Sequence, residues 1–454
     1  MQQERSRMLG SMPMGRLIPT ISVPIMISML VQALYNIVDS IFVARYSQEA
    51  LTAVSLAYPI QMLMVALSTG MGTGINSLVS RKLGEKRPDE AREAAKNGMM
   101  IEMASWLLFV VVGLLLSRPL MALFTPDAVL QELGTEYLTI VCTVSVGLFG
   151  SICFERLMQA TGNTVGSMLT QLIGAVVNII LDPIMIFGYW GLPAMGIAGA
   201  AWATVIGQIS SMLLGLFLNQ TRNKELHLSW KGFRPSPQML RGIVAVGLPS
   251  TVMSSISSVL NVCMNMILIA FGNAAVSVLG VYFKLQSFVF MPVFGLSNGL
   301  VPIVGYNYGA RLRSRVYGAI RVALCWAGTI MILGTAAFLL IPETLMSLFE
   351  TGEASELTAI GVVALRTICL SFIPAAVGIT LSTVFQAVGK GTYSLVMSLC
   401  RQLVVLLPAA WILSKIGLSA IWWAFPIAEI ASVIICLVLF RKCNREMLRP
   451  LGEH

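Results

Sequence analysis

The chain has 454 residues, of which 56% are hydrophobic and only 11% are charged, and its mean hydropathy is +0.81. The charged fraction is about half that of a soluble domain, so the composition indicates a polytopic membrane protein and excludes a soluble enzyme with one membrane anchor. The eight cysteines are scattered without a CxxC pair, and the two histidines, His227 and His454, lie in a polar loop and at the last residue. These patterns exclude a disulfide framework and a histidine-based metal centre.

Apolar runs recur along the chain after a polar, basic segment at 1–16. Each run has about 20 residues or more, which is the length that crosses the hydrocarbon core of a bilayer. They predict twelve transmembrane helices, near 17–44, 52–80, 98–116, 136–160, 167–188, 195–218, 243–270, 276–305, 319–341, 357–386, 395–413 and 420–440. The expected fold class is therefore an all-α polytopic membrane protein.

Basic residues predict the orientation of these helices. Twelve spans place both termini on one side of the membrane, and cytoplasmic loops are enriched in Lys and Arg. With cytoplasmic termini, 23 of the 30 Lys and Arg residues fall in cytoplasmic segments and only three (Arg45, Arg118 and Lys415) fall in outer loops. We therefore expect a multi-pass protein of the plasma membrane with cytoplasmic termini. The net charge of +9 then reflects this topology and contact with anionic lipids, not nucleic-acid binding.

The second half of the chain repeats the first. A shift of 225 residues aligns Pro24 with Pro249, Asn36 with Asn261, Gln61 with Gln286, Gly70 with Gly295, Gly74 with Gly299 and Gly84 with Gly309. Shifts of 227 and 221 align Gln159 with Gln386, Gly162 with Gly389, Ser167 with Ser394, Trp202 with Trp423 and Gln208 with Glu429. Because each half has an even number of spans, the halves enter the membrane in the same sense and should be related by an axis along the membrane normal. We expect two pseudo-symmetric six-helix lobes, 1–218 and 243–454, joined by a polar cytoplasmic linker at 219–242.

Two acids of the first half have no counterpart in the second. Asp39 and Asp182 lie inside apolar segments, and the repeat aligns them with Met264 and Ala409. A carboxylate at the centre of a bilayer costs roughly 2.5–3.5 kcal/mol on insertion scales and usually belongs to a proton or ion pathway. The sequence therefore predicts an off-centre coupling site in the first lobe.

Helical spacing groups other polar residues with these acids. Gln32, Tyr35 and Asp39 fall at i, i+3 and i+7 on one face of the first span. Asn178 and Asp182 fall at i and i+4 on one face of the fifth. We expect these residues to line the coupling site and the substrate cavity.

The fifth and sixth spans leave alternatives open. Pro183 lacks an N–H, which frees a backbone carbonyl one turn earlier for a cation or water. Thr204 lies among small residues that allow close helix packing. Asp182 could instead serve only in a helix kink at Pro183, and Asn178 or Thr204 only in interhelical hydrogen bonds.

Proline also suggests a hinge in the first span. Pro24 lies fifteen residues before Asp39, and its repeat partner Pro249 lies fifteen before Met264. Each proline weakens its helix, and we expect Pro24 to act as a hinge when Asp39 takes up an ion. The alternative is that both prolines are static bends.

Other charged residues also fall inside predicted spans, among them Glu155, Arg156, Lys284 and Arg401. Glu155 and Arg156 are adjacent near the cytoplasmic end of the fourth span, where an interfacial pair is favoured over a gate. Lys284 and Arg401 lie in spans of the second half and must find partners or water.

Four motifs carry a resemblance to a known family: YNIVDSIFVA in the first span, NIILDPIMIFG in the fifth, and the paired cytoplasmic motifs SRKLGEKR and YNYGARLR. Together they resemble the multidrug and toxic compound extrusion (MATE) family, in its prokaryotic DinF-like branch, over almost the whole chain. The resemblance implies a V-shaped transporter of two six-helix lobes. It also implies export of cationic and amphipathic compounds, driven by an inward flow of H⁺ or Na⁺.

The resemblance further implies where coupling occurs. In the DinF-like branch the coupling residues lie in the first lobe, at positions that match Tyr35, Asp39, Asn178, Asp182 and, with a looser alignment, Thr204. Any Na⁺ would bind at the last four. Another branch carries further acids in its seventh and tenth spans, and the interiors of those spans contain none here. This difference favours coupling in the first lobe and leaves the ion open.

Other functions fit the sequence less well. A flippase for lipid-linked precursors, the main alternative, needs a basic central cavity, whereas the predicted cavity here is acidic. A membrane enzyme lacks a nucleophile motif, and ATP-driven transport lacks a Walker motif. We expect a monomeric exporter that contacts membrane lipids and small-molecule substrates and uses no cofactor apart from the coupling ion.

Overall fold

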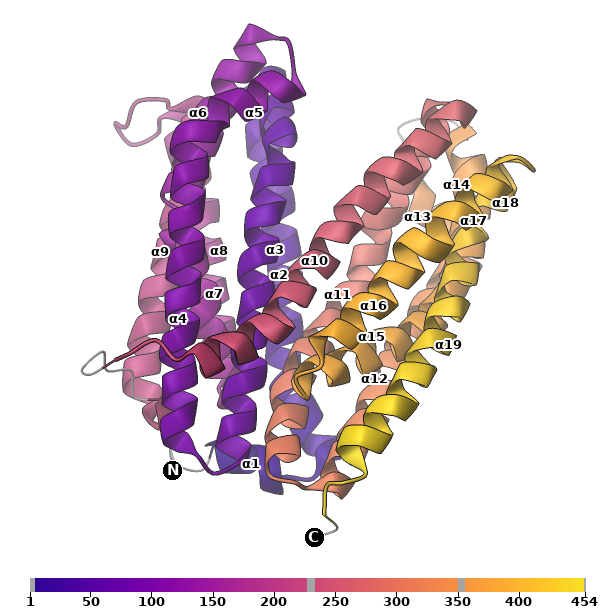
Figure 1. Cartoon of the computed structure of the whole chain (residues 1–454). Coiled ribbons are helices and arrows are strands. Elements are labelled where there is room, and N and C mark those ends of the chain that lie inside the picture. The colour runs from indigo at the N-terminus through magenta and orange to yellow at the C-terminus, as the bar shows by residue number, and fades with distance from the viewer. Residues whose placement is uncertain (1–4, 227–232, 350–355, 453–454) are drawn as a thin grey trace.

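The computed structural model of the chain describes residues 5–226, 233–349 and 356–452 (Figure 1). This part of the chain is almost entirely helical and contains no strand. Both histidines, His227 and His454, lie outside the described residues.

The prediction of twelve transmembrane helices is confirmed. Within the described ranges, eleven helices are long and apolar enough to cross a membrane, and a helix pair bent by 43° makes the twelfth. The spans are α2 (Met14–Tyr46), α3 (Gln48–Gly84), α4–η1–α5 (Pro88–Phe124), the bent pair α6 (Ala128–Thr143) and α7 (Val146–Ala160), α8 (Thr164–Phe187), α9 (Gly196–Arg222), α10–η3 (Pro237–Phe271), α11 (Asn273–Gly309), α12 (Arg313–Leu340), α14–η4–α15 (Glu356–Ala387), α16–η5–α17 (Gly391–Ser414) and α18–α19–η6 (Leu418–Leu448). Three short helices, α1 (Arg5–Ser11), η2 (Lys224–Leu226) and α13 (Pro342–Ser347), connect them.

The repeat extends to the backbone of the turns. Lys86 and Arg311, which are 225 residues apart, both have a φ of +59°, a value that is uncommon outside glycine. Gly162 and Gly389, which are 227 residues apart, have φ values of +80° and +89°. The aligned positions therefore close the same turns in the two halves.

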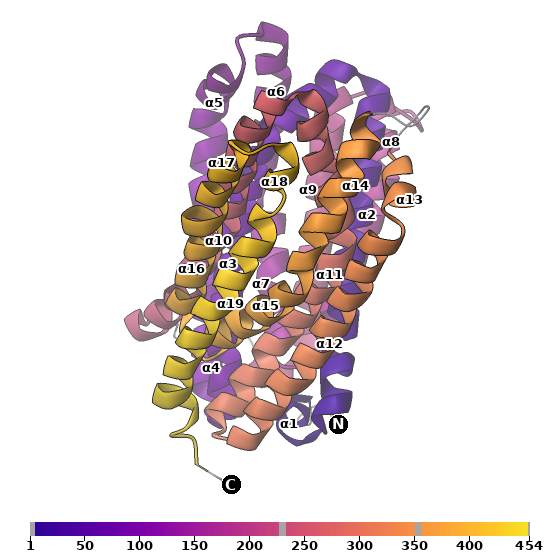
Figure 2. The ribbon, with the colours of Figure 1, turned by 90° about the vertical axis from the view of Figure 1, so that its right-hand side faces the viewer.

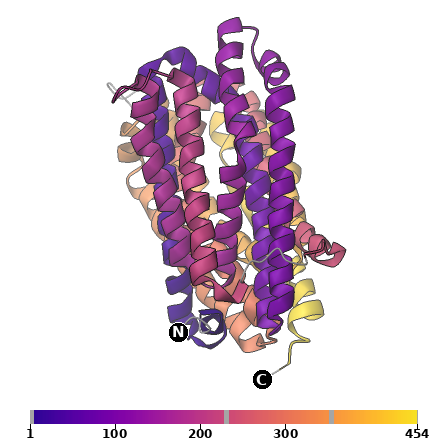
Figure 3. The same cartoon turned by 90° about the vertical axis from the view of Figure 1, so that its left-hand side faces the viewer.

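The helices form two bundles that meet at the end carrying both termini and diverge toward the opposite end (Figure 1). We call the end with the termini the inner end. Figure 2 views the bundle formed by the second half of the chain, and Figure 3 views the bundle formed by the first half.

Two helices pass from one lobe to the other. Leu17 and Ile21 of α2 pack in the core of the second lobe, whereas Val43 at the other end of α2 packs in the core of the first lobe. In α10, Ile243 packs in the first lobe and Met264 in the second. The inner parts of α2 and α10 are thus exchanged between the lobes.

Pro24 and Pro249 lie between these two parts of α2 and α10, and both helices continue through their prolines. In α2, the hydroxyl of Ser28 donates to the carbonyl oxygen of Pro24 at 3.0 Å. Each proline therefore occupies the segment that must deform if the lobes move relative to one another.

Aligned glycines form the seam between the lobes. An added methyl group at Gly74 of α3 would overlap the carbonyl oxygen of Ile243 in α10. At Gly299 of α11, the aligned position, it would overlap the side chain of Ser22 in α2. Small residues allow helix backbones to approach this closely in membranes. The duplicated glycines therefore hold the inner halves of the lobes together.

The connection between the lobes is tied to the first lobe. α9 ends at Arg222 and α10 begins at Pro237, so both helices extend into the predicted linker at 219–242. Leu226 is buried in the core of the first lobe, and the Ser236 N–H donates to Asn97 Oδ1 at 2.9 Å.

Candidate functional site

Two acids from distant parts of the sequence meet inside the first lobe. α2 and α8 pack side by side and bring the carboxyl groups of Asp39 and Asp182 within hydrogen-bonding reach of each other. The Asp182 side chain is fully buried and that of Asp39 is partly buried. The Oδ1 atom of each has no hydrogen-bond partner in the described part of the chain. The pair can therefore accept a proton or a cation.

Local structure explains how α8 presents Asp182. The helix begins after Asn163, whose side-chain oxygen accepts from the Gly166 N–H at 3.2 Å, and ends at Gly188, whose φ of +77° suits a residue without a side chain. Pro183 within the helix cannot donate to the turn that precedes it.

Asn178 connects Asp182 to α9. The Asn178 amide is oriented so that its nitrogen and its oxygen each have a hydrogen-bond partner. In this orientation Nδ2 donates to Asp182 Oδ2 at 3.2 Å, and Oδ1 accepts from the Thr204 N–H at 3.0 Å. The Thr204 hydroxyl donates to the carbonyl of Ala200 at 3.0 Å. The structure thus places four predicted site residues together, with oxygen atoms of the kind that Na⁺ and other hard cations bind.

Tyrosines surround the two acids. Tyr35 lies close enough to both carboxyl groups to interact electrostatically with them, and so does Tyr137 of α6. The Tyr137 hydroxyl is 3.5 Å from Oε1 of Gln61 in α3. Tyr137 could not be predicted as a site residue from the sequence, because a tyrosine in an apolar span carries no signal of its own. Gln61 had a signal, since it aligns with Gln286 in the repeat.

Gln32 is not part of this group. Its side chain is exposed. Pro24 lies farther toward the inner end of α2, at the boundary between the segments that pack on the two lobes.

A second buried polar cluster lies in the inner half of the first lobe. Glu155 is only 5% exposed, and its Oε2 accepts from Gln171 Nε2 at 2.8 Å. Arg156 donates to Gln159 Oε1 at 3.0 Å instead of pairing with Glu155. The expected interfacial pair is therefore wrong, because Glu155 is buried inside the lobe, between α7 and α8.

Glu102 belongs to the same inner half and was absent from the sequence analysis. It is 2% exposed and accepts from the Ser68 hydroxyl at 2.9 Å, and its other oxygen has no partner among the described residues. Its position inside a predicted span was a signal in the sequence. The polar residues at the start of that helix obscured this signal.

In the second lobe Arg401 is paired with an acid. Arg401 lies in the π-helical turn η5 (Cys400–Leu406), and its Nη1 is 2.9 Å from Oε1 of Glu429 in α19 (Ala424–Cys443). Lys284 is exposed, with its Nζ 5.9 Å from the centroid of the Phe349 ring. The repeat aligned Glu429 with Gln208, but the sequence analysis did not identify it as the partner of Arg401.

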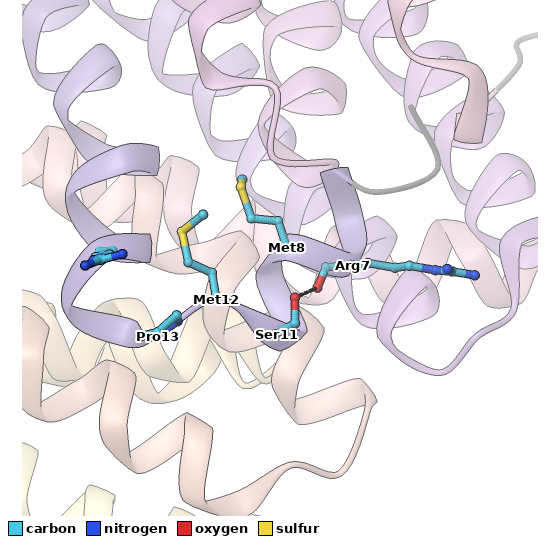
Figure 4. A pocket seen from close by; sticks show the side chains of 6 residues that line it. Arg7, Met8, Ser11, Met12 and Pro13 are labelled. Atoms are coloured by element: carbon cyan, nitrogen blue, oxygen red, sulfur yellow. Dashed lines mark hydrogen bonds between the residues drawn. The ribbon is translucent and has the colours of Figure 1, made fainter. Parts of the chain in front are cut away.

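A cavity of about 590 Å³ lies elsewhere, at the inner end of the molecule. It is lined by Arg7, Met8, Ser11, Met12, Pro13 and Arg16, from α1 and the start of α2. Figure 4 shows Met8 and Met12 side by side, with Arg7 extending away from them. None of these side chains is part of the Asp39–Asp182 site.

Comparison with known proteins identifies the family. The MatE family model matches residues 24–184 and again 249–412, one match in each half of the chain. The chain belongs to the MATE family. This is a family of transporters, not of enzymes, and the two matches follow the duplication that the repeat predicted.

Individual relatives cover nearly the whole chain. The chain is 24% identical over 441 residues to the multidrug export protein MepA of Staphylococcus aureus strain MRSA252, covering 97% of this chain and 96% of MepA. It superimposes with a TM-score of 0.90 on an outward-facing multidrug resistance MATE transporter, at 25% identity, covering 98% and 99% of the two chains. A MOP superfamily transporter of Pyrococcus furiosus also gives a TM-score of 0.90 at 25% identity, covering 97% and 98% of the two chains. All three relatives confirm the twelve-helix MATE fold, and the two that are named as multidrug transporters favour an exporter over a flippase.

Proposed function

We propose that this MATE transporter exports small cationic and amphipathic molecules across the plasma membrane in exchange for protons, which bind at Asp39 and Asp182. The observation that supports the proton is that the two carboxyl groups lie within hydrogen-bonding reach of each other inside the lobe. No described Lys or Arg forms an ion pair with either acid. Two carboxylates this close in a poorly solvated site cannot both stay charged, so the pair must share a proton or hold a cation.

The pair couples the two fluxes by competition. When the pair is deprotonated, it attracts a cationic substrate, and when it is protonated the attraction is lost and the substrate is released. A proton driven inward by 100 mV supplies roughly 2.3 kcal/mol, and each unit of pH gradient adds about 1.4 kcal/mol. This energy is enough to shift a two-state equilibrium by more than tenfold. With the inner end in the cytoplasm, as the basic residues predict, the lobes diverge toward the outside and the pair loads protons from there.

Sodium is the second candidate ion. The oxygen atoms of Asn178 and Thr204 lie beside Asp182 and could complete a site for a hard cation. The proton is favoured because the carboxyl groups contact each other, which a shared proton explains without a metal ion.

Ion dependence tests the proposal. The purified chain in proteoliposomes should transport ethidium, a fluorescent cation, when a pH gradient is imposed at equal Na⁺ on both sides. A Na⁺ gradient at equal pH should drive little transport. Transport that follows only the Na⁺ gradient would replace the proton by Na⁺ at the same site, and no transport under either gradient would overturn the proposed antiport.

A further inference from the structure

The proton site lies far from the inner end of the molecule. Asp182 is about 27 Å along α8 from Thr164, the first residue of the helix, at about 1.5 Å per residue. Its side chain is completely buried. A proton bound there must still reach the cytoplasm if the proposed antiport is to proceed.

A continuous polar face of α8 leads in that direction. Ser167, Gln171, Asn178 and Asp182 follow one another at spacings of four, seven and four residues, which places them on one side of the helix. Ser167 and Asn178 are buried, and each hydrogen-bonds to a polar side chain or backbone group of the lobe interior. The face therefore runs inside the lobe, away from lipid.

α9 supplies polar groups where α8 lacks them. Gly174 occupies the gap between Gln171 and Asn178 and lets α9 approach α8 closely, because a Cβ at Gly174 would lie 3.2 Å from both the Gly207 carbonyl oxygen and the Ser211 Cβ. Thr204, Gln208 and Ser211 share one face of α9 at spacings of four and three residues. The Oε1 atom of Gln208 is buried without a partner in the described part of the chain.

An unpaired acid lies at the inner end of this face. Glu155 of α7 is bound to Gln171 and is 5% exposed. The adjacent Arg156 donates to Gln159 and interacts with Glu155 only electrostatically, without a hydrogen bond between them in the described part of the chain. Gln171 donates to Glu155 through Nε2, and its Oε1 atom is buried without a hydrogen-bond partner in the described part of the chain. About 16 Å along α8 separates Gln171 from Asp182.

The second lobe has no such path. The repeat replaces Glu155 by Ser382, Asn178 by Val405 and Asp182 by Ala409. At the gap itself, Gly174 and Gln208 are replaced by Arg401 and Glu429, which bind each other at 2.9 Å. Packing of the fold therefore does not require the polar face of α8.

We infer that this face of α8 and α9 is a proton route through the first lobe, and that Glu155 is its inner proton acceptor, which receives the proton from Asp39 and Asp182 and releases it to the cytoplasm. The inference rests on the proposed proton antiport. Gln171, Ser211 and Thr204 are positioning residues that hold the water or hydroxyl groups through which the proton moves. Each transfer moves one proton from one oxygen to the next, and no other reactant is required.

The test uses Glu155→Gln, which keeps the shape of the side chain but cannot release a proton. In proteoliposomes, ethidium transport driven by a pH gradient should fall about 100-fold, the lower end of what a positioned proton-transfer group contributes. In detergent, the affinity for ethidium and the proton release on ethidium binding, followed with a pH dye, should stay unchanged. A purely structural role would alter both of these. Glu155→Asp should restore part of the transport.

Glu102→Gln is the matched control, because Glu102 is an equally buried acid of the same half that lies off this face. It should keep pH-driven transport. Unchanged transport in Glu155→Gln would overturn the inference and favour release of the proton between the lobes. Equal losses in both variants would also overturn it. If the unmutated chain shows no pH-driven transport, the proposed function fails and the inference fails with it.

Discussion

The two lobes share their scaffold and differ in their interiors. They repeat the same helices, the same positive-φ turns at Lys86 and Arg311, and the same seam glycines. Four acids in the interior of the first lobe, Asp39, Glu102, Glu155 and Asp182, align with Met264, Ala327, Ser382 and Ala409 in the second. The fold therefore forms without these acids, and their presence in one lobe reflects a function that needs buried charge.

The charges that the second lobe does contain are arranged differently. Arg401 and Glu429 neutralise each other across 2.9 Å, and η5 is a π-helical turn at the position where α8 is a regular α-helix. In the first lobe the aligned residues are Gly174 and Gln208, which carry no charge. One lobe thus satisfies its buried charge internally, while the other leaves its acids open to an ion.

The largest expected effect follows from replacing Asp39, one of the two neighbouring acids of the candidate site. Asp39→Asn should fold and reach the membrane but lose ethidium transport driven by a pH gradient, because an amide cannot exchange a proton. Drug resistance of a pump-deficient host and transport in proteoliposomes measure this loss. Met264→Leu, at the aligned position of the second lobe, is the control and should keep transport. A normally expressed Asp39→Asn variant with full transport would remove the acid pair from the mechanism.

Placing acids at the aligned positions of the second lobe should destabilise the protein or leave it inactive. Met264 is fully buried among apolar side chains, and Met264→Asp places a carboxyl group there without a partner. Burying such a group costs several kcal/mol, so we expect low yields and early elution on size exclusion, or an inert protein with a protonated acid. Ala409→Asp should behave similarly. A stable variant that moves more protons per ethidium would show that the second lobe can also couple.

The buried ion pair predicts a loss of stability with little direct effect on coupling. Arg401→Met leaves the half-buried Glu429 unpaired, which should lower the free energy of unfolding by about 1–3 kcal/mol. A lower thermal unfolding midpoint in detergent would show it. The double variant Arg401→Met/Glu429→Met should recover most of the midpoint, since no charge remains unpaired. If the single variant is as stable as the unmutated chain, the pair is not needed to neutralise Glu429.

The seam should respond equally on its two sides. Gly74→Ala and Gly299→Ala each place a methyl group against the opposite lobe, where it overlaps Ile243 or Ser22. We expect each to destabilise the protein by about 1–3 kcal/mol through overpacking. Matching shifts in the thermal midpoint would support a symmetric seam, and a large difference would show that one lobe dominates the contact.

The smallest expected effect concerns the prolines. Pro24→Ala should slow ethidium transport severalfold at unchanged expression, because α2 carries Asp39 and passes between the lobes at this point. Pro249→Ala should change the rate much less, since α10 carries Met264 instead of an acid. Equal effects in the two variants, or none, would place the moving element elsewhere and favour rigid rocking of the lobes.

Much of the fold could be predicted because it depends on local features of the chain. The lengths of apolar runs set the twelve spans, and paired turn residues such as Gly162 and Gly389 set the ends of the repeated helices. The presence of Asp39 and Asp182 inside apolar runs identified two residues of the candidate site. Their role in coupling remains a prediction, which the variants above test.

The partners of these residues required the tertiary structure. Helical periodicity places Glu155 on a helix face, but only packing decides whether that face meets lipid or Gln171. The same holds for Arg401, whose partner Glu429 comes from another helix. Tyr137 had no sequence signal because aromatic residues are common in apolar spans.

The sequence by itself determined that this protein is a duplicated twelve-helix membrane protein with acids in one half, because burial in a bilayer constrains each helix separately. Only the tertiary structure decided that Asp39 and Asp182 lie close together, that α2 and α10 exchange their inner halves between the lobes, and that Glu155 lies inside. The physical reason is that hydrophobic length fixes where a helix crosses the membrane. Its rotation and its neighbours are fixed by close packing of small residues and by the hydrogen bonds that buried polar groups must make.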